Sequence, residues 1–350
     1  MRDRFATPPR SVCIVMMSAI GDSVHVLPVV NALRRAWPET TISWIIQPLP
    51  HILVRDHPAV DEYLLFHRSR GAASWAAFSQ LAEQLKERRF DLVLALQVYL
   101  KAGIVTGLLS ADVKLGFDRA RARDLNWVFT NERIPPHDPQ HVQEQYFEFL
   151  EYLGVDPEPV VWGIRLTDEE LEAQYRFFRE IDRPTCAVVV GSTDRARNWT
   201  ADGYARAIEE LQNVHGLQPI LVGGPSAGER EMADRISSLT NADPIDTLGD
   251  DLRKLVWLLD GSALTLSPDT GPLHISRALD TPVVGLYGHT NPKRAGPFRA
   301  YYDLIVDGYA EFPGEEYPVS PARRDGSRRI TVDMVLEKLQ VAVDNYVAPR

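Results

Sequence analysis

The sequence has few cysteines and no long hydrophobic run. Only two cysteines, Cys13 and Cys186, occur in 350 residues. Each lies in an apolar run typical of a buried strand, so a buried thiol is favoured over a disulfide. No apolar stretch approaches the roughly 20 residues that span a bilayer. No apolar core of a signal peptide precedes Pro8 and Pro9. We therefore expect a cytoplasmic protein that at most touches a membrane surface.

Several motifs of common catalytic sites are also missing. No Asp-x-Asp occurs, which argues against the usual carboxylate pair that holds Mg²⁺ or Mn²⁺ on a sugar diphosphate. His137 and His141 are four residues apart, but Pro139 between them disrupts a helical metal-binding pair. Neither a P-loop nor a GxGxxG is present. We therefore expect no metal site and no cofactor, and phosphoryl transfer and nicotinamide chemistry are disfavoured.

The charge balance argues against a nucleic-acid partner. Lys and Arg total 38 against 48 Asp and Glu, a formal net charge of −10. General nucleic-acid binders obtain their affinity by neutralising phosphates, which needs an excess of positive charge. The composition is 45% hydrophobic and 25% charged, as in ordinary globular domains, and the length suffices for two of them.

Strand and helix patterns alternate along the chain, which predicts an α/β protein with parallel sheets. The expected strands are 12–17, 42–46, 63–66, 92–96, 187–190, 220–222, 263–266 and 283–287. The expected helices are about 22–36, 75–88, 99–109, 140–153, 167–181, 252–259, 272–279 and 332–346, with further helices opening near 200 and 229. The pattern predicts two doubly wound domains that bind ligands in a cleft between facing strand ends.

A proline-containing break at 155–159 suggests where the first domain ends. We expect a first domain over 1–165, a second over 166–330, and a C-terminal segment, 331–350, whose helix packs back on the first domain. That helix needs a surface on which to bury Val335, Leu336 and Leu339.

The turn after the 263–266 strand carries the strongest signal for a binding site. Asp269, Thr270 and Gly271 lie at a strand end and a helix start, where backbone N–H groups and the helix dipole attract anions. Lys293 follows the next strand and adds positive charge. This combination suits a sugar joined to a diphosphate. The structural alternatives are that Asp269 and Thr270 only cap the helix and that His274 is a hydrogen-bonded structural histidine.

Two other loops of the second domain end at the same edge of its sheet. Ser192, Thr193 and Arg197 provide hydroxyls and a guanidinium, which are typical phosphate ligands, although a solvated loop is the alternative. Gly223 allows the backbone to approach a ligand closely, and Glu229 is available to a ribose hydroxyl.

In the first domain, Asp22 lies at a helix start after the first strand. A carboxylate there is suited to accept a proton from an incoming hydroxyl, and the helix dipole favours its ionised form. A helix cap is the structural alternative. Gly21 and His25 flank it on the acceptor side, and His25 competes as the base. Lys101 and Arg123 fit an anionic acceptor, or form a solvated basic face.

Several stretches resemble the ADP-heptose:lipopolysaccharide heptosyltransferases, glycosyltransferase family 9. SAIGDSVHVLPVVNALRRAWP (18–38) resembles their amino-terminal motif. SPDTGPLHISRAL (267–279) and VVGLYGHTNPKRAGP (283–297) resemble their donor-site signature. The segments LQVYLKAG, LGFDRARARDLNWVFTN, HVQEQ and GSTDRARNWTADGYARAI lie between these in the family's order.

The resemblance implies a GT-B fold, two Rossmann-like domains facing each other across a cleft, and metal-independent, inverting transfer of a sugar from a nucleotide diphosphate. It implies that Asp22 is the general base. It further implies that Arg197, Thr270 and Gly271 hold the diphosphate and that Asp269 holds the sugar hydroxyls. The acceptor side would be lined by Lys101, Arg123 and His141. Family members often carry a lysine where Arg197 stands.

The implied donor is ADP-heptose, and the implied acceptor is an anionic glycan or glycolipid of the lipopolysaccharide-core type. Such an acceptor allows peripheral contact with the cytoplasmic face of the inner membrane. Two other functions stay open: a family member that uses another sugar donor, and a non-catalytic nucleotide-sugar binding protein on the same scaffold.

Overall fold

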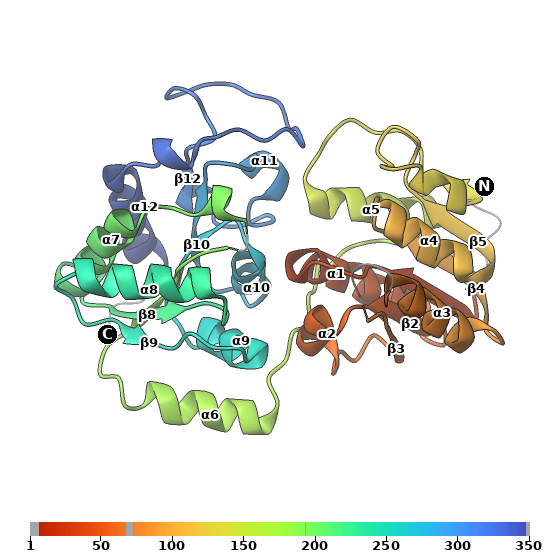
Figure 1. Ribbon diagram of the computed structural model, residues 1–350, viewed down its shortest axis with the longest axis horizontal. Coiled ribbons are helices and arrows are strands. Elements are labelled where there is room, and N and C mark those ends of the chain that lie inside the picture. Colours follow the sequence, from red (N-terminus) through yellow and green to blue (C-terminus); the bar gives the residue numbers. More distant parts are fainter. Residues whose placement is uncertain (1–6, 68–72, 193, 348–350) are drawn as a thin grey trace. The chain divides into compact units, whose positions relative to one another are not determined.

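A computed structural model of the chain describes residues 7–67, 73–192 and 194–347. The chain divides into two compact units (Figure 1). Met1–Asp138 and Val142–Arg165 form the first unit, and Pro139–His141 and Leu166–Arg350 form the second.

The first unit is built on a six-stranded parallel sheet in the order β3-β2-β1-β4-β5-β6. Its strands are β1 (Ser11–Val15), β2 (Thr41–Ile46), β3 (Glu62–Leu65), β4 (Arg89–Ala95), β5 (Ser110–Gly116) and β6 (Glu132–Arg133). Its helices are α1 (Ile20–Ala36), α2 (Pro48–Val54), α3 (Ala73–Leu85), α4 (Leu100–Leu108) and α5 (Val142–Leu153). The central strands β1 and β4 are almost wholly buried, as expected for a sheet covered on both faces.

The second unit repeats this architecture, with the order β12-β11-β10-β7-β8-β9. Its strands are β7 (Thr185–Val189), β8 (Gln218–Val222), β9 (Ile245–Asp246), β10 (Leu264–Pro268), β11 (Val283–Tyr287) and β12 (Ile305–Asp307). Its helices are α6 (Asp168–Phe178), α7 (Ala201–Asn213), α8 (Ala227–Leu239), α9 (Leu252–Asp260), α10 (Gly271–Ala278), α11 (Pro292–Ala295) and α12 (Val332–Tyr346). Strands β7, β10 and β11 are buried along their whole length.

Both sheets have the strand order of a dinucleotide-binding fold, in which the order reverses beside the first strand. The reversal lies between β1 and β4 in the first unit and between β7 and β10 in the second. Ligands of such sheets bind at the carboxyl ends of the strands at this switch point. The prediction of an α/β protein with two doubly wound sheets is confirmed.

The last helix packs on the second unit, so the expectation that it returns to the first domain is wrong. Val335, Leu339 and Ala342 of α12 are buried in one cluster with Trp199 of the β7–α7 loop and Tyr204 of α7. Figure 1 shows α12 beside α7. The amphipathic pattern correctly indicates a buried face, but both domains offer helices against which such a face can pack.

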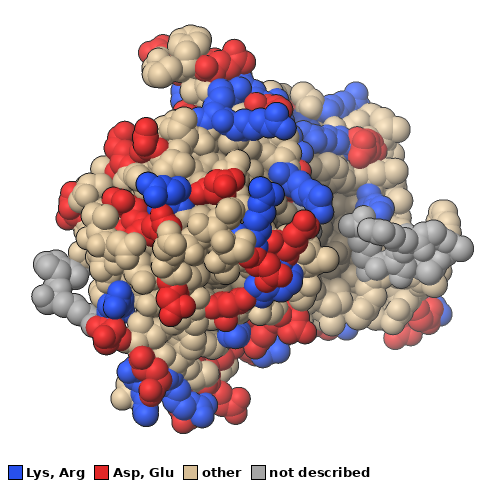
Figure 2. Space-filling model, turned by 60° about the vertical axis from the view of Figure 1, so that its left-hand side comes forward, with Lys and Arg blue, Asp and Glu red and all other residues tan. Residues whose placement is uncertain are grey.

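Acidic and basic side chains alternate over the part of the surface that Figure 2 shows, without a continuous basic face. Among the described residues, no helix is both long enough and apolar enough to cross a membrane.

Candidate active site

Arg197 and Asp269 meet at the switch point of the second sheet. Arg197 ends the short turn Arg195–Arg197 after β7, and Asp269 follows β10 directly. The Nη1 atom of Arg197 donates to the main-chain oxygen of Asp269 at 2.7 Å and lies 3.1 Å from its Oδ2. The two loops that a ligand would touch at this edge are therefore joined by a charge-assisted contact.

Asp269 is surrounded by hydrogen-bond donors although only 3% of it is exposed. The hydroxyl of Thr290 donates to Oδ2, and Nε2 of His274 lies 3.5 Å from Oδ1. Burial raises the pKa of Asp269, but the contacts with His274, Arg197 and Thr290 outweigh it, so the pKa lies below its ordinary value. Asp269 is therefore a fixed, ionised acceptor.

The amino end of α10 lies beside this carboxylate. Thr270 is its N-cap residue and Gly271 its first helical residue. Within the described chain the Thr270 side chain makes no capping hydrogen bond; its Oγ1 lies 3.4 Å from Oγ of Ser267. The capping role considered for Thr270 is thus not seen, and the first N–H groups of α10 are not taken up by that side chain.

The loop after β7 is shaped by its own polar side chains. The N–H of Ser192 donates to Oδ1 of Asn198 at 2.7 Å, and Oγ of Ser192 accepts from the N–H of Asp194 at 3.2 Å. The Ser192 side chain thus stabilises the loop. Thr193, also expected to contact the donor, lies outside the described residues.

Glu229 closes the amino end of α8. Its Oε1 accepts from the N–H of Gly224 at 2.9 Å, and its Oε2 accepts from the hydroxyl of Ser226 at 2.6 Å. A Cβ at Gly223 would lie 3.3 Å from Oε1 of Glu229, so the glycine permits this close packing. Both carboxylate oxygens already accept a hydrogen bond, which is a structural role that the sequence analysis did not foresee.

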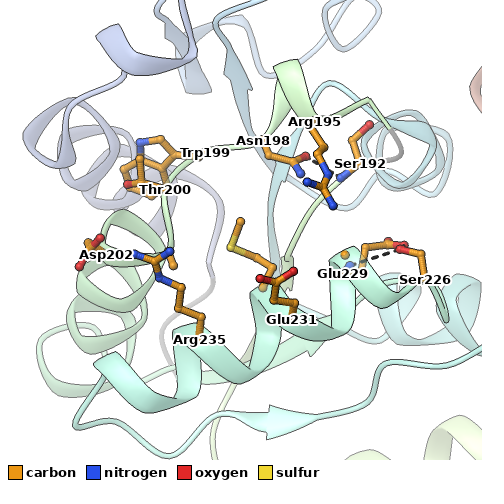
Figure 3. A pocket seen from close by; sticks show the side chains of 13 residues that line it. Ser192, Arg195, Asn198, Trp199, Thr200, Asp202, Ser226, Glu229, Glu231 and Arg235 are labelled. Atoms are coloured by element: carbon orange, nitrogen blue, oxygen red, sulfur yellow. Dashed lines mark hydrogen bonds between the residues drawn. The ribbon is translucent and has the colours of Figure 1, made fainter.

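A pocket of about 610 Å³ opens between α7 and α8 (Figure 3). Arg195 enters it from the β7–α7 loop, and Glu231 and Arg235 enter it from α8. Ser192 and Glu229 also line it, so the pocket adjoins the two loops expected to bind the donor.

Lys293 is positioned by an aromatic contact. The main-chain N–H of Lys293 donates to Oδ1 of Asn291. Its side-chain Nζ donates to the main-chain oxygen of Tyr317 at 2.7 Å and lies 4.5 Å from the centre of the Tyr317 ring. The cation is therefore directed toward the segment after β12.

In the first unit, Asp22 lies in the first turn of α1. Its Oδ2 accepts from the N–H of Ala19 at 2.9 Å. The preceding residues are held by Gln97, which follows β4: its Oε1 accepts from the N–H of Met17, and its Nε2 donates to the oxygen of Ser18. Gln97 joins the two loops at this switch point, as Arg197 does in the second unit.

Gln97 and Thr290 were not singled out from the sequence. The signal that points to them is the same for both, a polar side chain shortly after a buried strand.

His25 packs inward. Its Nδ1 lies 3.0 Å from Oε1 of Gln143, and Nε2 of Gln143 donates to the main-chain oxygen of His25 at 2.9 Å. His25 is 4% exposed and Gln143 is fully buried. This reciprocal pair fastens α5 to α1, so the acceptor contact expected of His25 has no support in its geometry. Gly21, in the same helix, is half-buried next to Asp22.

Lys101 and Arg123 are both exposed at the carboxyl end of β4. Lys101 is in the first turn of α4, and the Arg123 guanidinium lies 5.8 Å from the ring of Tyr99, the N-cap residue of that helix. The N–H of Arg123 donates to the oxygen of Val98 at 2.9 Å, which fixes the loop. The two cations expected to bind an acceptor thus lie on the same edge as Asp22.

His141 packs within the second unit. Its Nε2 donates to the oxygen of Gly296 at 2.9 Å, and its ring lies 5.0 Å from that of Phe298. Burial lowers the pKa of His141 to about 4, although its contact with Gly296 acts in the opposite direction. His141 is therefore neutral at neutral pH, which leaves it a hydrogen-bond donor rather than a cation.

The sequence model of glycosyltransferase family 9 (heptosyltransferase) matches residues 78–315. The chain belongs to this family. It is 28% identical to the lipopolysaccharide core heptosyltransferase OpsX of Haemophilus influenzae over 338 residues. This alignment covers 96% of this chain and 95% of that protein. It is 29% identical over 323 residues to lipopolysaccharide heptosyltransferase 1 of Pseudomonas aeruginosa, covering 89% of this chain and 85% of the relative.

Solved structures of this glycosyltransferase family have the same fold. A family 9 glycosyltransferase from Veillonella parvula matches with a TM-score of 0.79 at 19% identity, over 95% of this chain and 97% of that one. Heptosyltransferase WaaC of E. coli, solved with ADP, matches with a TM-score of 0.71 at 21% identity, over 96% and 99%. The two Rossmann-like units are those of a GT-B glycosyltransferase.

Within the described residues, no three His, Cys, Asp or Glu side chains are grouped as metal ligands.

Proposed function

We propose that this enzyme is an inverting heptosyltransferase that moves heptose from ADP-heptose to a lipopolysaccharide-core-type glycan. The similarity to a lipopolysaccharide core heptosyltransferase over nearly the full length of both chains supports the acceptor class. The linked pair Arg197 and Asp269 at the switch point of the second sheet carries the proposal for the donor. A lipid-linked acceptor would bring the enzyme to the cytoplasmic face of the inner membrane.

In the proposed reaction, Asp22 takes the proton from an acceptor hydroxyl. The freed oxygen attacks the anomeric carbon of the donor, the bond from that carbon to the diphosphate oxygen breaks, and ADP leaves with its electron pair. Attack from the face opposite ADP inverts the anomeric centre. The contact of Asp22 with the Ala19 N–H supports this role, because it orients the carboxylate at the amino end of α1, where the helix dipole favours the ionised form.

The leaving diphosphate needs positive charge and N–H donors. We assign these to Arg197, to Thr270 and Gly271 at the amino end of α10, and to Lys293, which together make the step independent of a metal ion. Asp269 binds hydroxyls of the sugar. The donor side of this proposal is completed by Ser192, Thr193, Gly223, Glu229 and His274.

On the acceptor side, Lys101 and Arg123 bind the anionic groups, and Gly21 allows the acceptor to approach Asp22.

The Asp22→Asn variant tests this function. Asparagine keeps the size and the oxygen that accepts from Ala19, so folding and ADP binding should persist. Turnover of ADP-heptose with a core-type acceptor should fall by about a hundred- to ten-thousandfold, the contribution of general-base catalysis. Product analysis by NMR should show the inverted anomer, and the wild-type rate should be unchanged in EDTA. A variant as fast as the wild type would contradict the assignment, and a wild type that binds ADP-heptose without transfer would indicate the binding protein instead.

A further inference from the structure

The segment between β12 and α12, residues 308–331, is hydrogen-bonded to two loops of the proposed donor site, the turn after β11 and the turn after β7. It forms the blue loop at the top of the second unit in Figure 1. Arg323 pairs with Thr290 in an antiparallel bridge, and the N–H of Arg324 donates to the oxygen of His289 at 3.1 Å. On the other side, the hydroxyl of Ser327 donates to the oxygen of Ala196. The segment therefore lies against the turn after β11 and against the turn that presents Arg197.

Side-chain contacts hold this segment in place. The Arg324 guanidinium pairs with Glu315 at 2.8 Å and lies 4.6 Å from the ring centre of Tyr309. The hydroxyl of Tyr317 donates to Asp307 at 2.6 Å. Arg323, the neighbour of Arg324, is thus carried on a fixed backbone while its own side chain stays 56% exposed.

Three nitrogen atoms surround one carboxylate oxygen, Oδ2 of Asp194. Arg323 Nη1 lies 3.6 Å from it, Arg197 Nε lies 3.8 Å from it and His289 Nε2 lies 4.0 Å from it. These separations exceed those of a hydrogen bond. Nε of Arg197 and Nε2 of His289 are also buried and have no hydrogen-bond partner among the described residues. The carboxylate oxygen thus lies among three nitrogen atoms without forming a hydrogen bond to any of them.

We propose that Arg323, His289 and Arg197 form a subsite for a phosphate group of the nucleoside diphosphate, which Asp194 occupies when no ligand is bound. This inference rests on the proposed function and extends the donor site to Asp194, His289 and Arg323. A phosphate has several oxygens in a tetrahedral arrangement and so reaches donors that one carboxylate oxygen does not.

His289 is held toward the subsite by its other ring nitrogen. Its Nδ1 lies 3.0 Å from the main-chain oxygen of Arg324, which makes Nδ1 the donor in that contact and leaves Nε2 facing Asp194.

Asp194 is able to leave the subsite without unfolding the loop. Its Oδ1 accepts from the N–H of Ala196 at 3.2 Å, a capping contact separate from the ion pairs of Oδ2. The substitution Asp194→Asn would keep this contact, because asparagine is an equally good cap, and would remove only the negative charge.

Calorimetric titration with ADP, inorganic pyrophosphate and adenosine tests the subsite. Asp194→Asn should bind ADP and pyrophosphate about two- to fivefold more tightly, the size of a partly exposed charge interaction. Arg323→Ala should bind both about five- to tenfold more weakly, as expected for loss of a charge-assisted hydrogen bond. Adenosine affinity should not change in either variant. Arg328→Ala, an exposed arginine of the same segment, is the matched control and should bind like the wild type.

Opposite shifts in the two variants support the inference. Weaker ADP binding by Asp194→Asn, or an Arg323→Ala variant indistinguishable from Arg328→Ala, would overturn it while the wild type still binds ADP and the proposed function stands. A wild type that binds neither ADP nor pyrophosphate would overturn both.

Discussion

Arg197 holds the backbone and the side chain of Asp269 at once, with one nitrogen 2.7 Å from the carbonyl oxygen and 3.1 Å from the carboxylate. These residues are far apart in the chain and follow neighbouring strands. The contact therefore fixes the spacing of two loops before any ligand arrives. A site arranged in this way loses little further order on binding, which favours affinity for a diphosphate.

Replacing Arg197 should weaken donor binding more than a loss of charge alone would suggest. Arg197→Ala should reduce ADP affinity by about 1.5–3 kcal/mol, the range for a hydrogen bond to a charged group. Arg197→Lys keeps the charge and should recover part of this loss. Calorimetry with ADP measures both, and a melting temperature close to the wild type controls for folding. Equal affinity in all three proteins would contradict the placement of the diphosphate.

The reciprocal pair of His25 and Gln143 should be structural. Gln143→Leu leaves buried polar atoms of His25 without this partner and should lower the free energy of unfolding by about 1–3 kcal/mol. Activity per folded molecule should stay near that of the wild type. Urea unfolding and initial rates at low temperature separate the two effects. A fully stable but inactive variant would show that His25 takes part in the reaction.

His141 should make the second unit sensitive to mild acid. Its pKa is lowered to about 4, so between pH 6.5 and 4 the unfolded chain binds a proton that the folded chain does not. The contribution of His141 to the free energy of unfolding is therefore fully present above pH 6.5 and decreases as the pH falls toward 4. Because the pKa falls from 6.5 to about 4, the loss should reach roughly 3 kcal/mol at pH 4, at about 1.4 kcal/mol per pKa unit.

Urea unfolding between pH 4 and pH 7 measures this slope. His141→Gln keeps a side-chain N–H donor but does not titrate, and should flatten the slope. His67→Gln, at an exposed position, is the control and should follow the wild type. A slope unaffected by His141→Gln would contradict the burial of this ring.

The packing of α12 should be essential for the second unit. Leu339 is fully buried in the same cluster as Trp199 and Tyr204. Leu339→Ala should lower the free energy of unfolding by about 2–5 kcal/mol, the usual range for a large-to-small core substitution. Tryptophan fluorescence in urea, to which Trp199 in this cluster contributes with the other six tryptophans, should report the change. Gln340→Ala, on the exposed side of the same helix, is the control and should unfold close to the wild type.

The strands nearest to the site were predictable because they are continuous apolar runs. Residues 263–266 and 283–287 correspond to β10 and β11, and the helix expected over 332–346 is α12. In contrast, β5 was missed because Ser110, Asp112 and Lys114 interrupt its apolar residues. The two-residue strands β6 and β9 are too short to show a period.

The candidate site was predictable in its loops but not in its contacts. Turn residues after strands identify Asp22, Arg197 and Asp269, since topology brings strand ends to one edge. Their partners depend on side-chain directions that no spacing encodes. Glu229, for example, turns back to Gly224 and Ser226, and an acid at this position of a helix looks the same in the sequence whether it binds a ligand or the backbone.

The attachment of α12 to the second unit also affects how the protein is made. Everything from Leu166 onward, including α12, belongs to the second unit. The ribosome therefore releases all parts of the first unit before the second is finished, which allows the halves to fold in order during synthesis. Exchanging the second half with that of a related enzyme therefore needs a junction near Arg165 together with a matching change of Pro139–His141, which also belong to the second unit.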